Sequence, residues 1–240
     1  MRIITTLFYR KELKRLRRNY KLFLKLLNNA IEKYKKDDHD QFLEAYLLLS
    51  NKLLIDVQAV KILWERGLYG SAFAMTTIIL RSVRMAGALY LKQELLSKYL
   101  NEEKNSDIDK EFIREFSEGA LRRILDERFG KLERGQYANL EKSLHGSSVG
   151  AKIFYGKIRH NLNGTKGGDI VYDVFFEKEK SKGIINILCG AIIDICGVYV
   201  EKYQSDDFVK NIEIEYTRLV KYETEELNRD TTQHPNLFNI

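Results

Sequence analysis

The chain of 240 residues contains one proline, Pro235, which falls among its last six residues. Proline removes a backbone hydrogen-bond donor and clashes with the preceding helical turn, so residues 1–234 can form long helices without an interior breaker. Helical periodicity of apolar residues fills most of that length. We therefore expect an all-α protein: an antiparallel multi-helix bundle that forms a single domain over residues 1–228, followed by a loose tail at 229–240.

The expected helices cover 10–36, 40–66, 69–100, 107–129, 134–144, 182–203 and 206–228. Two of them carry a clear apolar stripe, and the last carries a partly apolar one. The first stripe contains Leu13, Leu16, Tyr20, Leu24, Leu27, Ile31 and Tyr34; the second contains Phe42, Tyr46, Leu49, Leu53, Val57, Val60 and Trp64; the last contains Phe208, Ile212, Tyr216, Leu219 and Glu223. A β-branched and aromatic run at 170–176 indicates a short β element, as an isolated strand or a hairpin arm.

Composition excludes several classes of protein. Apolar residues make up 44% and charged residues 31%, values typical of a folded globular chain. The four histidines and two cysteines are scattered without the paired spacing of a zinc site, and the glycine-rich stretches lack the ending of a phosphate loop. We therefore expect no metal and no cofactor. The N-terminal residues lack the pattern of a secretory signal, which predicts a cytoplasmic protein.

The most apolar stretch, 183–200, approaches the length of a membrane span but contains Asn186 and Asp194. A charge at the centre of a bilayer costs about 3 kcal/mol, so a buried core helix is the better interpretation and no membrane partner is expected. Cys189 and Cys196 lie two turns apart on this helix, beyond the reach of a disulfide. They are predicted to be buried free thiols.

The first predicted helix carries a basic face. Lysine and arginine clustered on one helix form the electrostatic footprint of nucleic-acid binders, although a solvated surface gives the same pattern. The formal net charge of +6 raises non-specific affinity for nucleic acid or an anionic membrane without specifying either, and it does not distinguish RNA from DNA. The predicted nucleic-acid-binding residues are Lys11, Lys14, Arg15, Arg17, Arg18 and Lys21.

A second feature is Arg81, near the middle of the small-residue-rich and mostly apolar stretch 67–91. A buried arginine without a counter-charge costs several kcal/mol, so it needs a carboxylate partner. Asp194 is the acid within the apolar run at 183–200, and Asp56 stands among Leu53 and Val57. We therefore predict a buried polar centre in which Arg81 pairs with Asp56 or Asp194.

The blocks Leu80-Arg-Ser82 and Ser143-Leu-His-Gly-Ser147 resemble those of a prokaryotic domain-of-unknown-function family of helical proteins that is related in turn to the HEPN superfamily. The resemblance covers roughly residues 67–203. In that family an acidic residue commonly follows the arginine by one turn, whereas this chain has Met85. The resemblance implies a helical bundle and a role in bacterial defence or in a mobile element.

HEPN ribonucleases cleave RNA without metal, using an arginine and a histidine four to six residues apart. Here that spacing occurs only between Arg229 and His234, in the predicted tail, and we interpret it as a chance match. Arg159 and His160 form a more suggestive cluster, because a base beside a cation could act on a phosphate. Arg81, Ser143 and His145 could assemble a third arrangement. These five residues are the candidate catalytic residues.

Two classes of function follow. The first is a non-enzymatic helical protein that binds nucleic acid, a protein partner or a second copy of itself. The second is a metal-independent HEPN-like endoribonuclease built from the candidate catalytic residues. A cleft that brings an arginine and a histidine to one phosphate would favour the ribonuclease, and a filled core with dispersed histidines would favour the binding protein.

Overall fold

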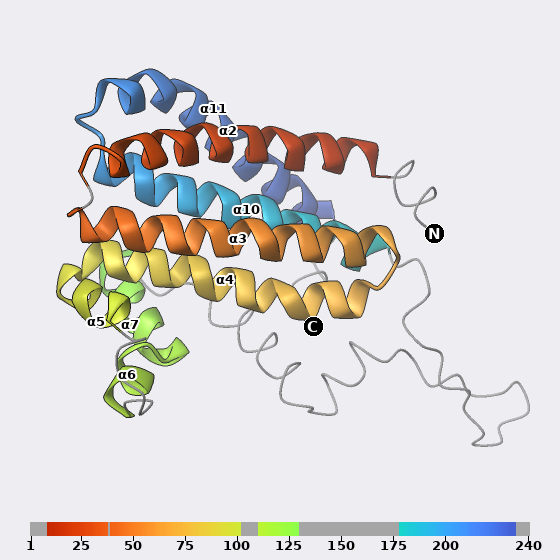
Figure 1. Ribbon diagram of the computed structural model, residues 1–240. Helices are drawn as coiled ribbons and strands as arrows, with labels where there is room; N and C mark the ends of the chain where they lie inside the picture. The colour runs from red at the N-terminus through yellow and green to blue at the C-terminus, as the bar shows by residue number, and fades with distance from the viewer. Residues whose placement is uncertain (1–8, 38, 102–109, 130–177, 234–240) are drawn as a thin grey trace, which may run out of the picture.

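The computed structural model describes residues 9–37, 39–101, 110–129 and 178–233, and these residues form an all-α bundle (Figure 1). Eight α-helices and one short 3-10 helix are present in this part of the chain, with no strand among them. The predicted fold class is confirmed. The helix expected at 134–144 and the β element expected at 170–176 lie outside the described residues.

Five long helices make up the bundle, and shorter ones follow the third. The long helices are α2 (Arg10–Tyr34), α3 (Gln41–Glu65), α4 (Tyr69–Leu91), α10 (Lys178–Lys202) and α11 (Asp207–Gln233). The short ones are η1 (Gln93–Leu95), α5 (Leu96–Leu100), α6 (Lys110–Glu115) and α7 (Glu118–Phe129). The five long helices begin and end within five residues of their predicted positions, except at the end of α4. The largest of these smaller differences is at the end of α11, which continues to Gln233, so the first part of the predicted tail at 229–240 is helical.

Two predicted helices are divided in the structure. The expected helix 69–100 ends at Leu91, because Lys92 leaves the helical region with φ −124° and ψ 82°. The expected helix 107–129 is interrupted at Ser117, whose hydroxyl accepts a hydrogen bond from the backbone N–H of Ala120 at 3.3 Å and so caps α7. Neither break involves glycine or proline, and for this reason the sequence pattern missed both.

The turn between α3 and α4 follows from one glycine. Gly67 has φ 81°, a conformation that costs glycine little. Its N–H bonds to the carbonyl of Trp64 at 3.0 Å, and the N–H of Leu68 bonds to the carbonyl of Leu63 at 2.9 Å, the hydrogen-bond pattern of a Schellman motif. The two helices are therefore antiparallel neighbours, as the sequence predicted.

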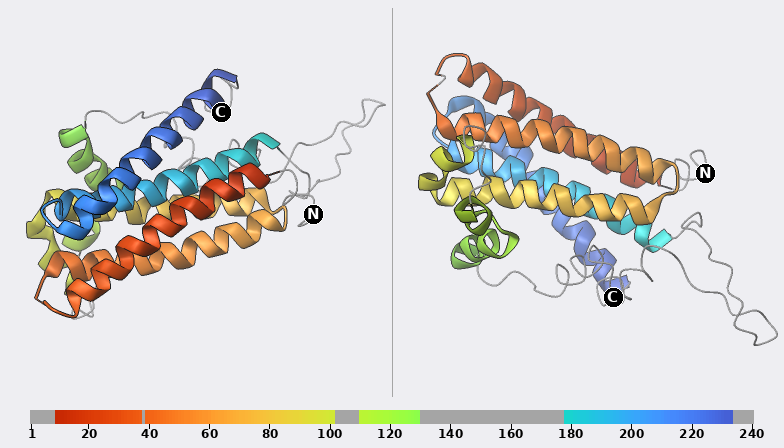
Figure 2. Two further views of the ribbon diagram at one scale, coloured as in Figure 1. Left: turned by 90° about the horizontal axis from the view of Figure 1, so that it is seen from above. Right: turned by 60° about the horizontal axis from the view of Figure 1, so that its bottom comes forward.

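The helices α2, α3, α4 and α10 surround one core, with α3 between α2 and α4 (Figure 1). Arg15 bonds to Asn186, and Tyr199 bonds to Asn29, so α2 and α10 run in the same direction. The last helix, α11, packs against α2 and α10 and diverges from the other long helices toward its C-terminal end (Figure 2). On the other side of the bundle, α7 packs against α4.

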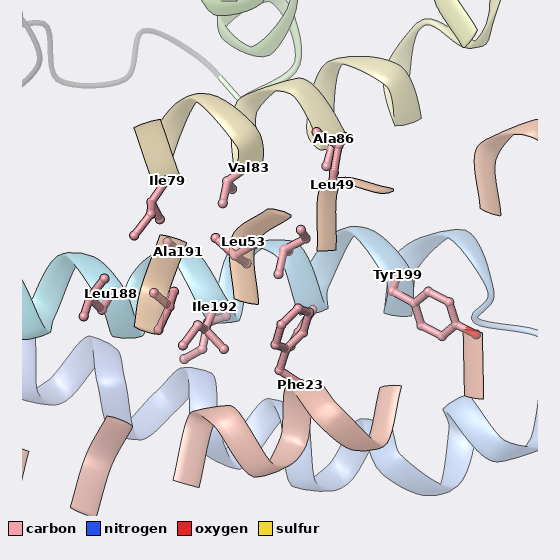
Figure 3. Close-up of a cluster of buried hydrophobic side chains, with 14 of the residues drawn as sticks. Phe23, Leu49, Leu53, Ile79, Val83, Ala86, Leu188, Ala191, Ile192 and Tyr199 are labelled. Atoms are coloured by element: carbon pink, nitrogen blue, oxygen red, sulfur yellow. The ribbon is translucent and has the colours of Figure 1, made fainter. Parts of the chain in front are cut away.

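The core is made of side chains from all four central helices (Figure 3). The whole predicted stripe of α3 is buried, which confirms that prediction. The predicted stripe of α2 is partly wrong: Leu24 and Ile31 are exposed, whereas Leu22, Phe23 and Leu26 are buried. The difference arises because α10 and α11 both pack on α2. The buried side of α2 therefore faces these two helices, and the side toward α3 is more exposed than predicted.

Candidate nucleic-acid interface

The basic residues of α2 divide into two groups, and the first group faces α11. Lys11 Nζ donates to Glu226 Oε2 at 2.7 Å, and Lys25 Nζ donates to Glu215 Oε2 at 2.6 Å. Lys33 pairs with Asp206 at 2.8 Å. These ion pairs follow one another along the two antiparallel helices. Carboxylates on or beside α11 therefore neutralise much of the basic face predicted for α2.

Arg15 lies at the buried centre of this contact. Its side chain is 2% exposed. The guanidinium donates to Glu223, with 3.1 Å between Arg15 Nε and Glu223 Oε2, and to Asn186 Oδ1 at 2.9 Å. Burial alone would lower the pKa of Arg15, but the hydrogen bonds and charge of Glu223 outweigh burial and raise it. Arg15 is therefore charged and enclosed, and its prediction as a nucleic-acid-binding residue is wrong.

Arg18 is partly exposed, and it also lies close to the buried carboxylate of Glu223. Its Nη2 lies 3.8 Å from Glu223 Oε1, and its guanidinium lies 3.9 Å from the centre of the Tyr222 ring. Guanidinium over a tyrosine face is a favourable cation–π contact. The side chains of Lys11 and Arg18 are 62% and 47% exposed, but both are bound to α11. Their main structural role is to fasten α11 to α2.

The second group points away from the bundle. Arg10, Lys14, Arg17 and Lys21 are all exposed, and they follow one another at steps of four, three and four residues. That spacing keeps the four side chains on one face over about 16 Å of helix. We call these four residues the outer ridge. Three belong to the predicted set. Arg10 was not predicted, although it continues the same spacing one turn toward the N-terminus.

The predicted buried polar centre around Arg81 is wrong. Arg81 and Asp194 are both exposed, and Asp56 forms an ion pair with Lys52 of its own helix. Arg81 is exposed because it lies two residues after the buried Ile79, and two residues place it on nearly the opposite side of α4. The cation of α4 that does meet a carboxylate is Arg84, which pairs with Glu118 at the start of α7.

Asp194 has an unusual environment despite its exposure. It projects from α10, whose flanking residues Ile193 and Ile195 are buried. The surrounding protein removes much of the water that would stabilise its charge and raises the pKa of this carboxyl to about 6. Asp194 therefore takes up a proton at a higher pH than an ordinary carboxyl, and it is not the partner of a buried arginine.

The other candidate catalytic residues, Ser143, His145, Arg159 and His160, lie outside the described residues, as do the tail residues His234 and Pro235. Among the described residues, no three His, Cys, Asp or Glu side chains are grouped so that they could hold a metal ion. Cys189 and Cys196 are buried free thiols, as predicted.

Two described helices, Tyr69–Leu91 and Ser181–Lys202, are long and apolar enough to cross a membrane. Both are mostly buried inside the bundle, as core helices are, so this property is weak support for a membrane location. Comparisons of the chain with protein-family models, with curated proteins and with solved structures give no match. The function is therefore inferred from the residues themselves.

Proposed function

We propose that this protein is a non-enzymatic binding protein that holds the phosphate backbone of nucleic acid along the outer ridge of α2. The observation that carries the proposal is the alignment of Arg10, Lys14, Arg17 and Lys21 on one exposed face. Resemblance of the chain to a prokaryotic helical family suggests a setting in bacterial defence or a mobile element.

The position of α2 in the bundle supports this function. The helix is fixed on one side by ion pairs to α11 and on another by the bond from Gln58 of α3 to the Tyr20 hydroxyl at 3.1 Å. A fixed helix presents its cations without the entropy cost of ordering a flexible segment. Phosphates follow one another along each strand of a duplex at about 3.4 Å of rise, so a face about 16 Å long can meet several of them.

The ridge carries charge but no feature that would read bases. Contacts to phosphate fix position without sequence information. We therefore expect binding that depends little on sequence and strongly on salt. If the four ridge cations neutralise four phosphates, the slope of log affinity against log salt concentration should be about −3.6 on duplex DNA and about −2.8 on single strands. Between 50 and 200 mM salt, affinity for duplex should fall by about 150-fold.

The test is fluorescence anisotropy with labelled duplex and single-stranded oligonucleotides over that range of salt. The variant K14A/R17A/K21A removes three ridge charges and should reduce the duplex slope to about −0.9. The control K36A/K52A/K210A removes three exposed lysines elsewhere on the bundle and should keep the wild-type slope. Equal loss in both variants would mean that net charge alone drives binding, and unchanged binding in the ridge variant would refute the proposal.

The alternative function, a metal-independent HEPN-like endoribonuclease, stays a prediction from the sequence. It depends on Ser143, His145, Arg159 and His160, outside the described residues, together with the exposed Arg81. Incubation with mixed structured RNAs in EDTA separates the two functions. We expect intact RNA; cleavage that disappears in His145→Ala or His160→Ala would replace the binding proposal with the enzymatic one.

A further inference from the structure

Three large apolar side chains form a line along the outer face of α3. Leu48, Ile55 and Ile62 are 54%, 63% and 48% exposed, although the rest of the helix buries a full inward stripe. They are spaced by seven residues, so they lie on nearly the same side of the helix and span about 21 Å. Isolated exposed apolar residues are ordinary, but a regular line of them is the pattern of a helix that packs against another helix.

The line continues onto α2. Gln58 bonds to the Tyr20 hydroxyl, and this contact sets the antiparallel register of the two helices. In that register Leu24 lies level with Leu54, and Ile31 lies level with Leu47. Leu24 and Ile31 are 36% and 38% exposed. Together Leu24, Ile31, Leu48, Ile55 and Ile62 form one apolar face, which we call the α2/α3 face.

The charges at the ends of α3 indicate what covers this face. Glu44 and Arg66 lie one turn beyond Leu48 and Ile62, on the same side of the helix, and neither has an ion pair within the described residues. The line is therefore symmetric about Ile55, with a negative charge at one end and a positive charge at the other. A second α3 placed antiparallel would match Leu48 with Ile62 and Glu44 with Arg66 of the partner subunit.

A parallel second copy would instead place glutamate against glutamate and arginine against arginine, which is unfavourable. We propose that the protein forms a two-fold symmetric homodimer in which the α2/α3 faces pack together, with the dyad at Ile55. A face about 21 Å long and two helices wide buries on the order of 400 Å² per copy, below the standard interface. The dimer should therefore be weak, with a dissociation constant in the micromolar range.

This dimer bears on the proposed function but does not depend on it. A dyad perpendicular to α3 and parallel to the face keeps α2 of both copies on the same side of the assembly. Leu24 lies near the dyad, and the outer ridge runs from Lys21 to Arg10 away from it. Arg17 of the outer ridge lies seven residues before Leu24 and therefore on the same side of α2, so in the dimer it would lie near Ile31 of the partner subunit. Dimer formation would thus cover part of each ridge.

The first test measures association directly. Sedimentation equilibrium at loading concentrations from about 1 to about 300 µM should show the 28.1-kDa chain passing to a species of twice that mass. Ile55→Glu places two carboxylates at the dyad and should abolish the dimer. Ile214→Glu on α11 is the matched control, since Ile214 is 61% exposed and Ile55 63%, and it should leave association unchanged.

The second test reads the antiparallel pairing itself. Glu44→Arg and Arg66→Glu each create like charges at both ends of the homodimer, so each variant alone should dissociate. An equimolar mixture of the two variants restores opposite charges at both ends and should recover the dimer. A monomer at every concentration, equal effects of Ile55→Glu and Ile214→Glu, or no recovery on mixing would each overturn the proposal.

Discussion

Arg15 of α2 and Glu223 of α11 form an ion pair that is closed off from solvent, with side chains 2% and 5% exposed. Two guanidinium nitrogens of Arg15 reach the same carboxylate, and its Nη1 bonds to Asn186 of α10 at 2.9 Å. Three helices that are distant in sequence therefore meet at one charge. Desolvating two ions opposes this arrangement, and the hydrogen bonds offset that cost as long as every partner is present.

The first prediction concerns removal of one partner. Glu223→Ala leaves the Arg15 guanidinium buried without its counter-charge, and we expect it to lower the free energy of unfolding by about 3 to 5 kcal/mol. Glu215→Ala is the matched control, because it breaks the Lys25 pair in the same helix contact at about half exposure and should cost under about 1 kcal/mol. Urea unfolding at neutral pH measures both.

The double variant Arg15→Met with Glu223→Leu then separates loss of a partner from loss of the contact. Replacing both ions with apolar side chains removes the desolvation cost, so this variant should recover most of the stability lost in Glu223→Ala. If it is as unstable as Glu223→Ala, the helix contact depends on the charges themselves and our account of the buried pair is wrong.

The second prediction concerns acid. Burial alone would raise the pKa of Glu226, but the hydrogen bond and charge of Lys11, with the charges of Arg15 and Arg229, lower it below its ordinary 4.5. The unfolded chain regains the ordinary value, so this pair stabilises the fold above pH 4.5 and its contribution is lost as the pH falls through the lowered pKa. Stability should therefore decline from about pH 5 to about pH 3.

Urea unfolding across that range tests this sign. Glu226→Gln cannot titrate and should show a shallower decline than the wild type. Glu225→Gln is the control, because Glu225 is about half exposed and lies 3.7 Å from Arg229. Its profile should follow the wild type. A Glu226→Gln profile that is parallel to the wild type would show that this carboxyl does not contribute to the acid sensitivity.

The sequence was sufficient to predict the fold class because helical periodicity and the lack of internal proline are local properties. In α3 every residue of the predicted stripe is buried, because these residues recur at steps of three and four and so share one side of the helix. Helix ends were less predictable. The end of α4 at Lys92 depends on where the next segment must pack, and no residue type marks it.

The buried arginine was predicted to be Arg81, whereas in the structure it is Arg15. Apolar neighbours in sequence suggested burial of Arg81, but a residue's neighbours in sequence point in all directions around a helix. The better signal was Glu223, which continues the inward spacing of Ile212, Tyr216 and Leu219 on α11. A carboxylate at an inward position requires a buried cation, although which helix supplies it depends on packing that one sequence does not specify.

The third prediction concerns the two thiols. Burial raises the pKa of Cys189 to about 12 and raises that of Cys196 as well. Thiolate is the reactive form, so neither side chain should react with a disulfide reagent such as DTNB in the folded protein at about pH 8. Both should react within seconds after addition of denaturant. A thiol that reacts rapidly without denaturant would mean that α10 opens locally or is less enclosed than described.

The last prediction compares two glycines of α10 that lie seven residues apart. A Cβ at Gly190 would meet no atom within 4 Å, so Gly190→Ala should gain the full helix propensity of alanine, about 1 kcal/mol. A Cβ at Gly197 would lie 2.5 Å from the Tyr216 hydroxyl oxygen, which must then move. Gly197→Ala should therefore be less stable than Gly190→Ala by about 1 kcal/mol or more.

The cause of that difference can be isolated with Tyr216→Phe, which removes the hydroxyl oxygen. The next atom of the ring, Cζ, would lie 3.5 Å from the new Cβ, an ordinary van der Waals distance. In the Tyr216→Phe background Gly197→Ala should therefore become stabilising, whereas the gain from Gly190→Ala should be unchanged. Thermal unfolding of the single and double variants measures this. If Gly197→Ala is destabilising in both backgrounds, the close approach of α10 and α11 is set by backbone contact rather than by the tyrosine hydroxyl.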